Sequence, residues 1–545
     1  MINRCIAIWL ISYLQPLVLL VSSFYFQQMM LKEETETYKA WQNTPVPTFN
    51  KFYFFNVTNG FDVERNGAKP IVNEVGPFVY QIHLQKHSLI HNSNGTISYF
   101  EKKIWTFQPH LSVSDEMTII NTLNAPLVIT LSMLQTTTPA VRVLVTLALD
   151  AVTEGFFIKR TVKQLLFEGY PDMLTNFGPL LNPDIPRNTA GRFGYMLNKN
   201  ASNDGVYTVH SGVRDMNMIN FIDRYKGLNH LNYWSSEECN SLANSSTGQI
   251  WSIDSVKNYS AIRLFTSDVC RVLELNYNQT YKISDDLSVQ RFMLNSKSFK
   301  NSIDFPPNVC FMSRIRAPQP LFPPRESRNQ VRQSTRPFPS GVFDISTCKF
   351  GAPILISEPH FLNGDNYFLA TIVGLRPNHT KHGFWIDIDP FTGASVSLAA
   401  RLQINVAINK GQGSVRYRNI PDIVFPIFWE EVTMTLTPRY LHKLISAKTL
   451  PNYVASVSFY TLIGLGTTIL VITIFLFMGP KFQQFKVNHS DLAAIDPRKE
   501  VSLISKHKII QICDTHLQEK REIWRQKFSF SPKVEGIDNP SMVST

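Results

Sequence analysis

The cysteines are the residues whose spacing most clearly points to covalent chemistry. Of six in the 545-residue chain, Cys5 and Cys513 lie near the ends, and the other four fall in the middle: Cys239, Cys270, Cys310 and Cys348. An even set of cysteines in an oxidising compartment forms disulfides. Four cysteines allow three pairings, and their spacing does not choose among them. A bridge that closes a loop of about 70 residues would contribute roughly 4 kcal/mol on the chain-entropy model.

Catalytic chemistry has little support in the sequence. The chain contains no H-E-x-x-H, G-x-S-x-G, Walker or C-x-x-C pattern. Asp387 and Asp389 alternate along a predicted strand, so both would face one side as a carboxylate pair, but a solvated or hydrogen-bonded strand edge is the interpretation that we favour. His360 is a lone histidine and is expected to be structural. We therefore expect no enzymatic activity, no metal and no cofactor.

Glycan acceptors indicate which compartment holds the middle of the chain. The N-x-[ST] pattern occurs eight times, and only the copy at Asn488 lies close to the end of the chain. Such a pattern marks an exposed position in a secretory compartment, although a single copy also arises by chance. The seven predicted glycosylation sites are Asn56, Asn94, Asn200, Asn244, Asn258, Asn278 and Asn378.

Two charge-free stretches could anchor this middle portion in a membrane. Residues 5–26 would span roughly 33 Å as a helix, which is enough for a bilayer core. A cleaved signal peptide is the alternative, but its apolar core is shorter and no small-residue cleavage site follows. Residues 455–478 form the second and stronger candidate. Cys5, at the membrane boundary, is a candidate for palmitoylation.

The flanking charges set the expected topology. Arg4 precedes the first span and basic residues follow the second, whereas Glu33, Glu34 and Glu36 follow the first. This distribution places both ends in the cytosol. We therefore expect a cytosolic N-terminus (1–4), a first transmembrane helix (5–26), a glycosylated extracellular or lumenal ectodomain (27–454), a second transmembrane helix (455–478) and a cytosolic tail (479–545). The net charge of +11 is spread along the chain, so we expect no nucleic-acid partner.

The ectodomain reads as α+β. Strand-like runs bounded by Gly, Asn and Pro predict an antiparallel β core; examples are residues 51–57, 70–80, 204–212 and 384–398. Helical periodicity is concentrated between Pro139 and Tyr170, and shorter helices are expected around residues 112–123. Residues 314–341, with six Arg and six Pro, predict either a solvated extended loop or an electropositive surface. In the tail, residues 507–528 have one apolar helical face, which fits a membrane-surface helix or a largely disordered segment.

Several ordered motifs resemble the class B scavenger receptors, a family that includes fatty acid translocase, the high-density lipoprotein receptor, a lysosomal membrane protein and the sensory neuron membrane proteins. They include NEVGPFVY, DGVYTVHSG, YKGLNHLNYW, FTSDVCR, FDISTCKFGAPILISEPHFL and WIDIDPFTGASVSLAARLQINV. The resemblance covers residues 5–480. It implies one ectodomain with a large antiparallel β-barrel-like core, an apical helical bundle and an apolar tunnel that runs toward the bilayer, anchored by two transmembrane helices.

The resemblance also implies the disulfide pairing, Cys239 with Cys310 and Cys270 with Cys348. Two departures from the family pattern stand out. Met312 occupies the place of a cysteine that begins a third bridge in many relatives. Residues 150–154, Asp-Ala-Val-Thr-Glu, replace the lysines that some lipid-binding relatives carry on the apical helix, so a basic ligand patch is not carried over.

The expected function is that of a plasma-membrane receptor. It would bind lipids or lipoprotein particles and transfer fatty acids, sterols or sterol esters to the bilayer through the tunnel, because an apolar route avoids about 0.8 kcal/mol of exposure per CH₂. The alternative is a lysosomal or late endosomal sorting or adhesion receptor with protein ligands. We expect the ligand to enter between Pro139 and Tyr170, where apolar side chains adjoin cations: Phe156, Phe157, Lys159 and Arg160.

Overall fold

The computed structural model describes residues 27–485, except 136, 177, 183–190, 314, 316, 318–336 and 410–415. The chain divides into two compact units, Met1–Ile463 and Gly464–Thr545. Several predictions lie outside the described residues: the first transmembrane segment, palmitoylation of Cys5, most of the Arg/Pro segment, the sequon at Asn488 and the tail helix.

One large sheet organises the first unit. Its strands lie in the order β10 (Ser245–Ser246), β11 (Ile262–Thr266), β12 (Arg271–Ser284), β13 (Leu287–Leu294), β16 (Trp385–Ile388), β17 (Ser395–Ile408), β18 (Ile423–Thr435), β1 (Thr48–Val57), β2 (Val72–His91), β3 (Thr96–Phe107), β8 (Ser202–His210) and β9 (Ile222–Tyr225). A branch, β15 (Ile354–Ser357) with β14 (Val342–Asp344), pairs with the second half of β17. All pairs are antiparallel except β10 with β11.

The two ends of this sheet approach each other. Phe221, directly before β9, forms an isolated bridge with Ser246 of β10. The mostly antiparallel sheet is therefore nearly closed into a barrel-like form, in agreement with the architecture expected from the sequence. Closure matters because side chains on the concave face of a barrel alternate with outward ones and can line an enclosed space.

Strand β1 shows how a run of aromatic residues fits this sheet. Phe52 and Phe54 are fully buried on one side, and Tyr53 points to the other side, where it stacks on Trp429 with ring centroids 3.8 Å apart. A bulge between Phe52 and Phe54 shifts the register, and Phe55 is buried against His360. The alternation of a strand, interrupted once, thus accommodates consecutive aromatics without exposing any of the three Phe rings.

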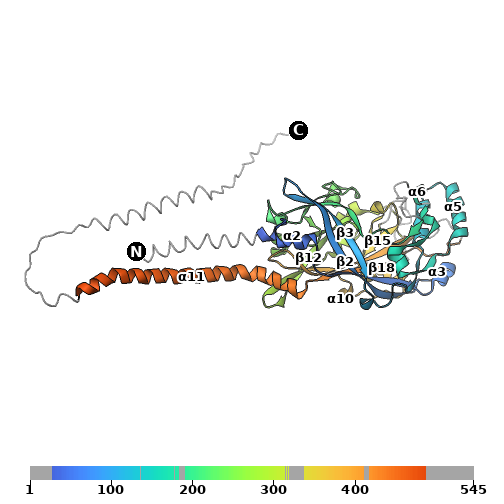
Figure 1. Cartoon of the computed structure of the whole chain (residues 1–545). Helices are drawn as coiled ribbons and strands as arrows, with labels where there is room; N and C mark the ends of the chain where they lie inside the picture. Colours follow the sequence, from blue (N-terminus) through green and yellow to red (C-terminus); the bar gives the residue numbers. More distant parts are fainter. Residues whose placement is uncertain are drawn as a thin grey trace, which may run out of the picture. The chain divides into compact units, whose positions relative to one another are not determined.

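Helices gather at one end of the first unit, where α3 (Gly60–Asn66), α5 (Pro139–Val152) and α6 (Gly178–Leu181) lie together (Figure 1). Helix α4 (Ala125–Leu134) packs beneath α5 and is almost wholly buried; its N-cap, Asn124, accepts a hydrogen bond from the Leu127 amide. Beside it, a π-helix spans Gln164–Glu168. We call this end the apex.

One helix prediction at the apex is wrong, and another is confirmed only in part. Residues 119–123 form strand β4 (Ile119–Leu123), which pairs with β5 (Phe157–Thr161), and residues 112–118 carry no helix. The predicted helical stretch 139–170 therefore holds one helix, one strand and one π-helical turn. The cause is non-local: the amide groups of β5 bond to a strand almost 40 residues earlier, and local periodicity cannot reveal that partner.

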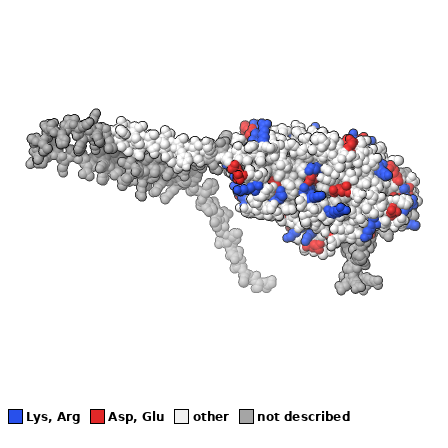
Figure 2. Space-filling view, turned by 90° about the horizontal axis from the view of Figure 1, so that it is seen from below, with Lys and Arg blue, Asp and Glu red and all other residues white. Residues whose placement is uncertain are grey.

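At the opposite end lie α2 (Glu36–Gln42) and the first turns of α11 (Pro438–Phe485) (Figure 1). Among the described residues, one helical segment is long and apolar enough to cross a membrane, Ser456–Leu476 within α11. It agrees with the second predicted span, residues 455–478. The described surface of this segment carries no charged side chain (Figure 2).

Candidate functional site

A cavity with a volume of about 1230 Å³ lies on the concave side of the sheet. Typical small-molecule pockets are roughly 300–1,000 Å³, so this space suits a larger ligand. Strands β1, β2, β3, β11, β16, β17 and β18 all contribute to its wall.

Alternation along β17 and β18 produces the apolar part of this wall. Between Leu398 and Ile404 of β17 the lining positions are Leu398, Ala400, Leu402 and Ile404; on β18 they are Phe428, Glu430, Val432 and Met434, with Leu436 directly after the strand. The register pairs these residues directly, for example Ala400 with Val432. Every second residue of both strands therefore faces the cavity, and all but one of these side chains are apolar.

The inner end of the cavity is closed by aromatic rings. Phe52 contacts Tyr80, Phe167 and Phe428, Tyr80 also contacts Phe167, and Trp105 packs on Phe167 with ring centroids 5.5 Å apart. We call these five residues the aromatic plug. Because Trp105 and Phe428 also line the cavity, the plug separates it from the packed apical core.

The outer end of the cavity is polar. Residues of α2 and of the first turns of α11 line it, among them Glu36, Lys39, Arg439, Tyr440 and Lys443. Glu36 bonds to Lys443 and Lys39, at 3.2 and 3.3 Å, and these two ammonium groups lower the pKa of its carboxyl. The mouth thus lies along the first turns of α11. Its last lining residue, Ala447, is nine residues, or roughly 14 Å of helix, before the apolar segment that begins at Ser456.

One side of the wall holds an ion-pair network. Lys103 of β3 lies 3.1 Å from Asp204 and 3.9 Å from Asp268, and Lys199 lies 3.0 Å from Asp204. Burial alone would lower the pKa of Lys103, but the carboxylates of Asp268 and Asp204 outweigh it and hold that pKa well above its usual value. These charges satisfy one another, so they provide a fixed polar surface rather than free binding groups.

Glu430 differs from the other carboxyl groups in the lining. Asn50 donates one hydrogen bond to its Oε2 at 3.0 Å, and burial, the dominant cause, raises the pKa of Glu430 to about 7. The adjacent Glu431 points to the opposite side of the sheet and pairs with Lys51 and Arg401 at 2.7 and 2.6 Å.

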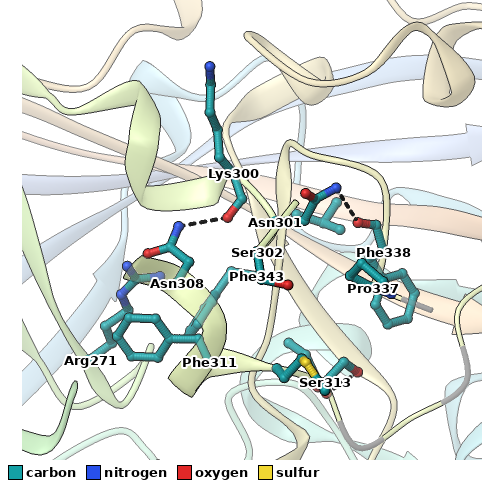
Figure 3. Close-up of a pocket in the computed structure, with 13 residues that line it drawn as sticks. Arg271, Lys300, Asn301, Ser302, Asn308, Phe311, Ser313, Pro337, Phe338 and Phe343 are labelled. Atoms are coloured by element: carbon teal, nitrogen blue, oxygen red, sulfur yellow. Dashed lines mark hydrogen bonds between the residues drawn. The ribbon is translucent and has the colours of Figure 1, made fainter. Parts of the chain in front are cut away.

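A second, much smaller pocket surrounds Arg271 (Figure 3). Its volume of about 40 Å³ has room for a few water molecules. The Arg271 guanidinium lies 3.8 Å from the centroid of the Phe311 ring and 4.6 Å from that of Phe343, and donates one hydrogen bond to the Ser298 carbonyl. Burial lowers the pKa of Arg271 to about 9. Arg271 is therefore part of the core, where stacking between the two rings stabilises its guanidinium group.

Glu74, His360 and His382 place three possible metal ligands within 4.8 Å of one another. Nδ1 of His360 accepts a hydrogen bond from the Arg376 amide, and Nδ1 of His382 accepts one from the Asn378 amide. Each neutral ring therefore carries its proton on Nε2, and His360 donates that proton to Glu74 at 2.6 Å. These hydrogen bonds connect Glu74 of β2 to the segment of residues 358–383, which agrees with the structural role expected for His360.

The sequence matches the CD36 family over residues 2–477. The chain belongs to the CD36 family. It is 32% identical to scavenger receptor class B member 1 of Mus musculus over 466 residues, 84% of this chain and 85% of that protein. It is 30% identical to lysosome membrane protein 2 of Homo sapiens over 412 residues, 74% of this chain and 78% of that protein. The sequence motifs had predicted relatives of both kinds, a scavenger receptor and a lysosomal membrane protein.

The structure of this CD36 family member joins Cys239 to Cys310 and Cys270 to Cys348. Six of the seven asparagines predicted to carry glycans are exposed, and Asn56 is half-buried, with its Oδ1 accepting a hydrogen bond from the Asn121 amide. Glycan attachment at Asn56, Asn94, Asn200, Asn244, Asn258, Asn278 and Asn378 stays a prediction.

The four residues predicted at the point of ligand entrance do not form one exposed surface. Phe156 is 1% exposed and belongs to the main core, and Phe157 is half-buried against Phe425. Lys159 is exposed, whereas Arg160 pairs with Glu154 at 2.6 Å and lies over the Tyr170 ring. The exposed apolar side chains of the apex include Val141, Val143, Leu144 and Leu147 of α5 and Phe61 of α3.

Two features of the site were missed by sequence reasoning. Glu430 was hidden in a Glu-Glu pair, although the alternation Phe428, Glu430, Val432 marks it as sharing a face with apolar residues. Glu74 and His382 approach His360 only through the fold, since 286 residues separate Glu74 from His360.

Proposed function

We propose that this chain is a membrane receptor that binds lipids or lipoprotein particles and transfers lipid to the bilayer through the cavity. The observation that carries the proposal is the 1230 Å³ cavity, with its apolar β17–β18 wall and a mouth at the start of α11. A lipid chain inside this space avoids about 0.8 kcal/mol of water exposure per CH₂. The family relationship supports the receptor role, because one relative is named a scavenger receptor.

The proposed layout follows the sequence: cytosolic residues 1–4, spans at 5–26 and 455–478, a glycosylated ectodomain at 27–454 and a cytosolic tail at 479–545. The apolar segment Ser456–Leu476 supports the second span. Protease added to intact cells should digest the ectodomain and spare epitope tags at Met1 and Thr545. A terminal tag that is accessible from outside would contradict this layout.

Blocking the cavity tests the transfer route. Ala400 lines the apolar wall opposite Val432, so Ala400→Trp would place a large ring in the path. The matched control is Ala261→Trp, at an exposed position just before β11. At equal surface levels, we expect Ala400→Trp to reduce uptake of a fluorescent lipid several-fold and the control to leave it unchanged. Unchanged uptake in both variants would show that lipid does not pass through this cavity.

A second candidate function is that of a lysosomal or late endosomal receptor for a protein ligand. It is favoured by the exposed apolar face of α5, where Leu144 is 71% exposed and Leu147 60% exposed. The relative named lysosome membrane protein 2 is consistent with that residence. Late endosomal staining, together with no copurifying lipid in mass spectrometry, would favour this function over lipid transfer.

A further inference from the structure

Glu430 sits at the inner end of the cavity. Its neighbours across the ladders are Leu402 on β17 and Phe52 on β1, so it adjoins the aromatic plug. On β1 only Thr48 and Asn50 line the cavity, and from Phe52 onward the chain joins the packed core. Glu430 is thus the last polar side chain on β18 that a ligand meets before the plug.

Four carboxyl residues line the cavity among the described residues, and three of them have a cation partner. Glu36 pairs with Lys39 and Lys443, Glu101 with Lys86 at 3.1 Å, and Asp268 with Lys103 at 3.9 Å. In the described part of the chain Glu430 makes no ion pair, and its one hydrogen bond is from Asn50.

An unpaired carboxyl group among apolar side chains lacks a hydrogen-bonding or ionic partner. Glu430 is half-buried, and a carboxylate that faces apolar side chains with one neutral partner is stabilised by a further ionic or hydrogen-bonding partner. Lys103 faces Glu430 from β3 and Asp268 from the β11–β12 turn, but these two charges already pair with each other. The side chain that completes the site is therefore absent from the lining, which points to a group on the ligand.

We infer that Glu430 binds the hydroxyl group of a lipid alcohol, either a sterol or a long-chain alcohol, at the inner end of the cavity. This inference rests on the proposed lipid-binding function and specifies its ligand class. A hydroxyl donates to either carboxyl oxygen and adds no charge to the cavity. An ester cannot donate, and a fatty acid anion would place a second negative charge beside the carboxylate.

The test compares lipids that differ only in the donor. Full-length chain in nanodiscs would be titrated at pH 8.5, above the pKa of Glu430, so that its carboxyl group is ionised and only accepts hydrogen bonds; the probes are cholesterol and cholesterol methyl ether, and hexadecan-1-ol and its methyl ether. A hydrogen bond to a charged group contributes about 1.5–3 kcal/mol, so wild-type protein should prefer one or both alcohols by roughly 10- to 100-fold. Preference in the sterol pair alone, or in the linear pair alone, identifies which alcohol is the ligand.

Two substitutions and one control assign the preference to Glu430. Glu430→Leu should abolish it while leaving ether affinity unchanged, and the isosteric Glu430→Gln should keep part of it, since an amide oxygen still accepts. Glu237→Gln, at an exposed position outside the cavity, should not change the ratio. Equal affinity for alcohol and ether in the wild type, or an unchanged ratio in Glu430→Leu, would overturn the inference. If none of the four probes binds the wild type, the proposed lipid-binding function fails as well.

Discussion

Asp387 and Asp389 look equivalent in the sequence, yet the same substitution should have very different effects at the two positions. Asp387 is fully buried, and its carboxylate accepts two hydrogen bonds from Arg291, both 2.8 Å, one from Tyr281 at 2.6 Å and one from Ser397 at 2.8 Å. Asp389 is also buried, but it bonds only to the amide and hydroxyl of Thr392 in the turn after β16.

In Asp387→Asn, one acceptor oxygen becomes a donor and Arg291 loses its counter-ion. Breaking a buried ion pair typically costs about 3–5 kcal/mol. The Arg291 side chain keeps 24% exposure and stacks on Trp385, so the lower figure, about 3 kcal/mol, is expected. Asp389→Asn keeps the oxygen that Thr392 bonds and should cost under about 1 kcal/mol.

The assay is urea unfolding of full-length protein in detergent, with tryptophan fluorescence as the probe and the free energy of unfolding obtained from midpoint and slope. The double variant Asp387→Leu with Arg291→Met, which removes both charges, should lose less stability than Asp387→Asn alone. Equal destabilisation by Asp387→Asn and Asp389→Asn would refute the assignment of different roles to the two carboxylates.

Three further predictions concern the bridges, the apex and pH. The paired cysteines are separated by 71 and 78 residues, so replacing either pair by serine should lower the free energy of unfolding by roughly 4 kcal/mol. Nonreducing peptide maps should show Cys239–Cys310 and Cys270–Cys348, and another pairing would contradict the structure. The double variant Leu144→Ser with Leu147→Ser should reduce lipid uptake at matched surface levels, because these side chains form the exposed apolar face of α5. Ile303→Ser, at an equally exposed site, should leave uptake unchanged. Equal uptake by the wild type and both variants would place the ligand entrance elsewhere. The pKa of Glu430 is about 7 in the folded protein and 4.5 in the unfolded chain, so between these pH values the folded protein holds one more proton and loses stability as the pH rises. Glu430→Gln should therefore raise the free energy of unfolding by on the order of 3 kcal/mol at pH 8 and by little at pH 4.5. An effect that does not depend on pH would argue against a protonated carboxyl group.

The β core was predictable because alternation and turn residues are local signals. Residues 51–57, 70–80 and 204–212 were expected as strands and lie in β1, β2 and β8. The helix predicted across residues 112–123 failed because β4 depends on β5, far along the chain.

The cavity could not be read from the sequence for a different reason. Residues such as Leu402 and Ile404 have the same pattern whether they pack into a core or line an open space. Only the closure of the sheet separates the filled apical half from the open half. The wall charges were equally hidden, since Lys103 is paired by residues about 100 and 165 positions later.

The two disulfides interlock along the chain, since Cys270 lies between Cys239 and Cys310, and Cys348 lies beyond both. A single peptide-bond cleavage anywhere from 240 to 347 therefore leaves the two fragments covalently joined. The arginines at 325, 328 and 332, none of which precedes a proline, are cleavage points for trypsin-like proteases, and all lie inside the Cys270–Cys348 loop. A receptor nicked there would run as a full-length band until its disulfides were reduced. In a protease-rich compartment, the protein would thus remain one molecule after a single cut in this segment.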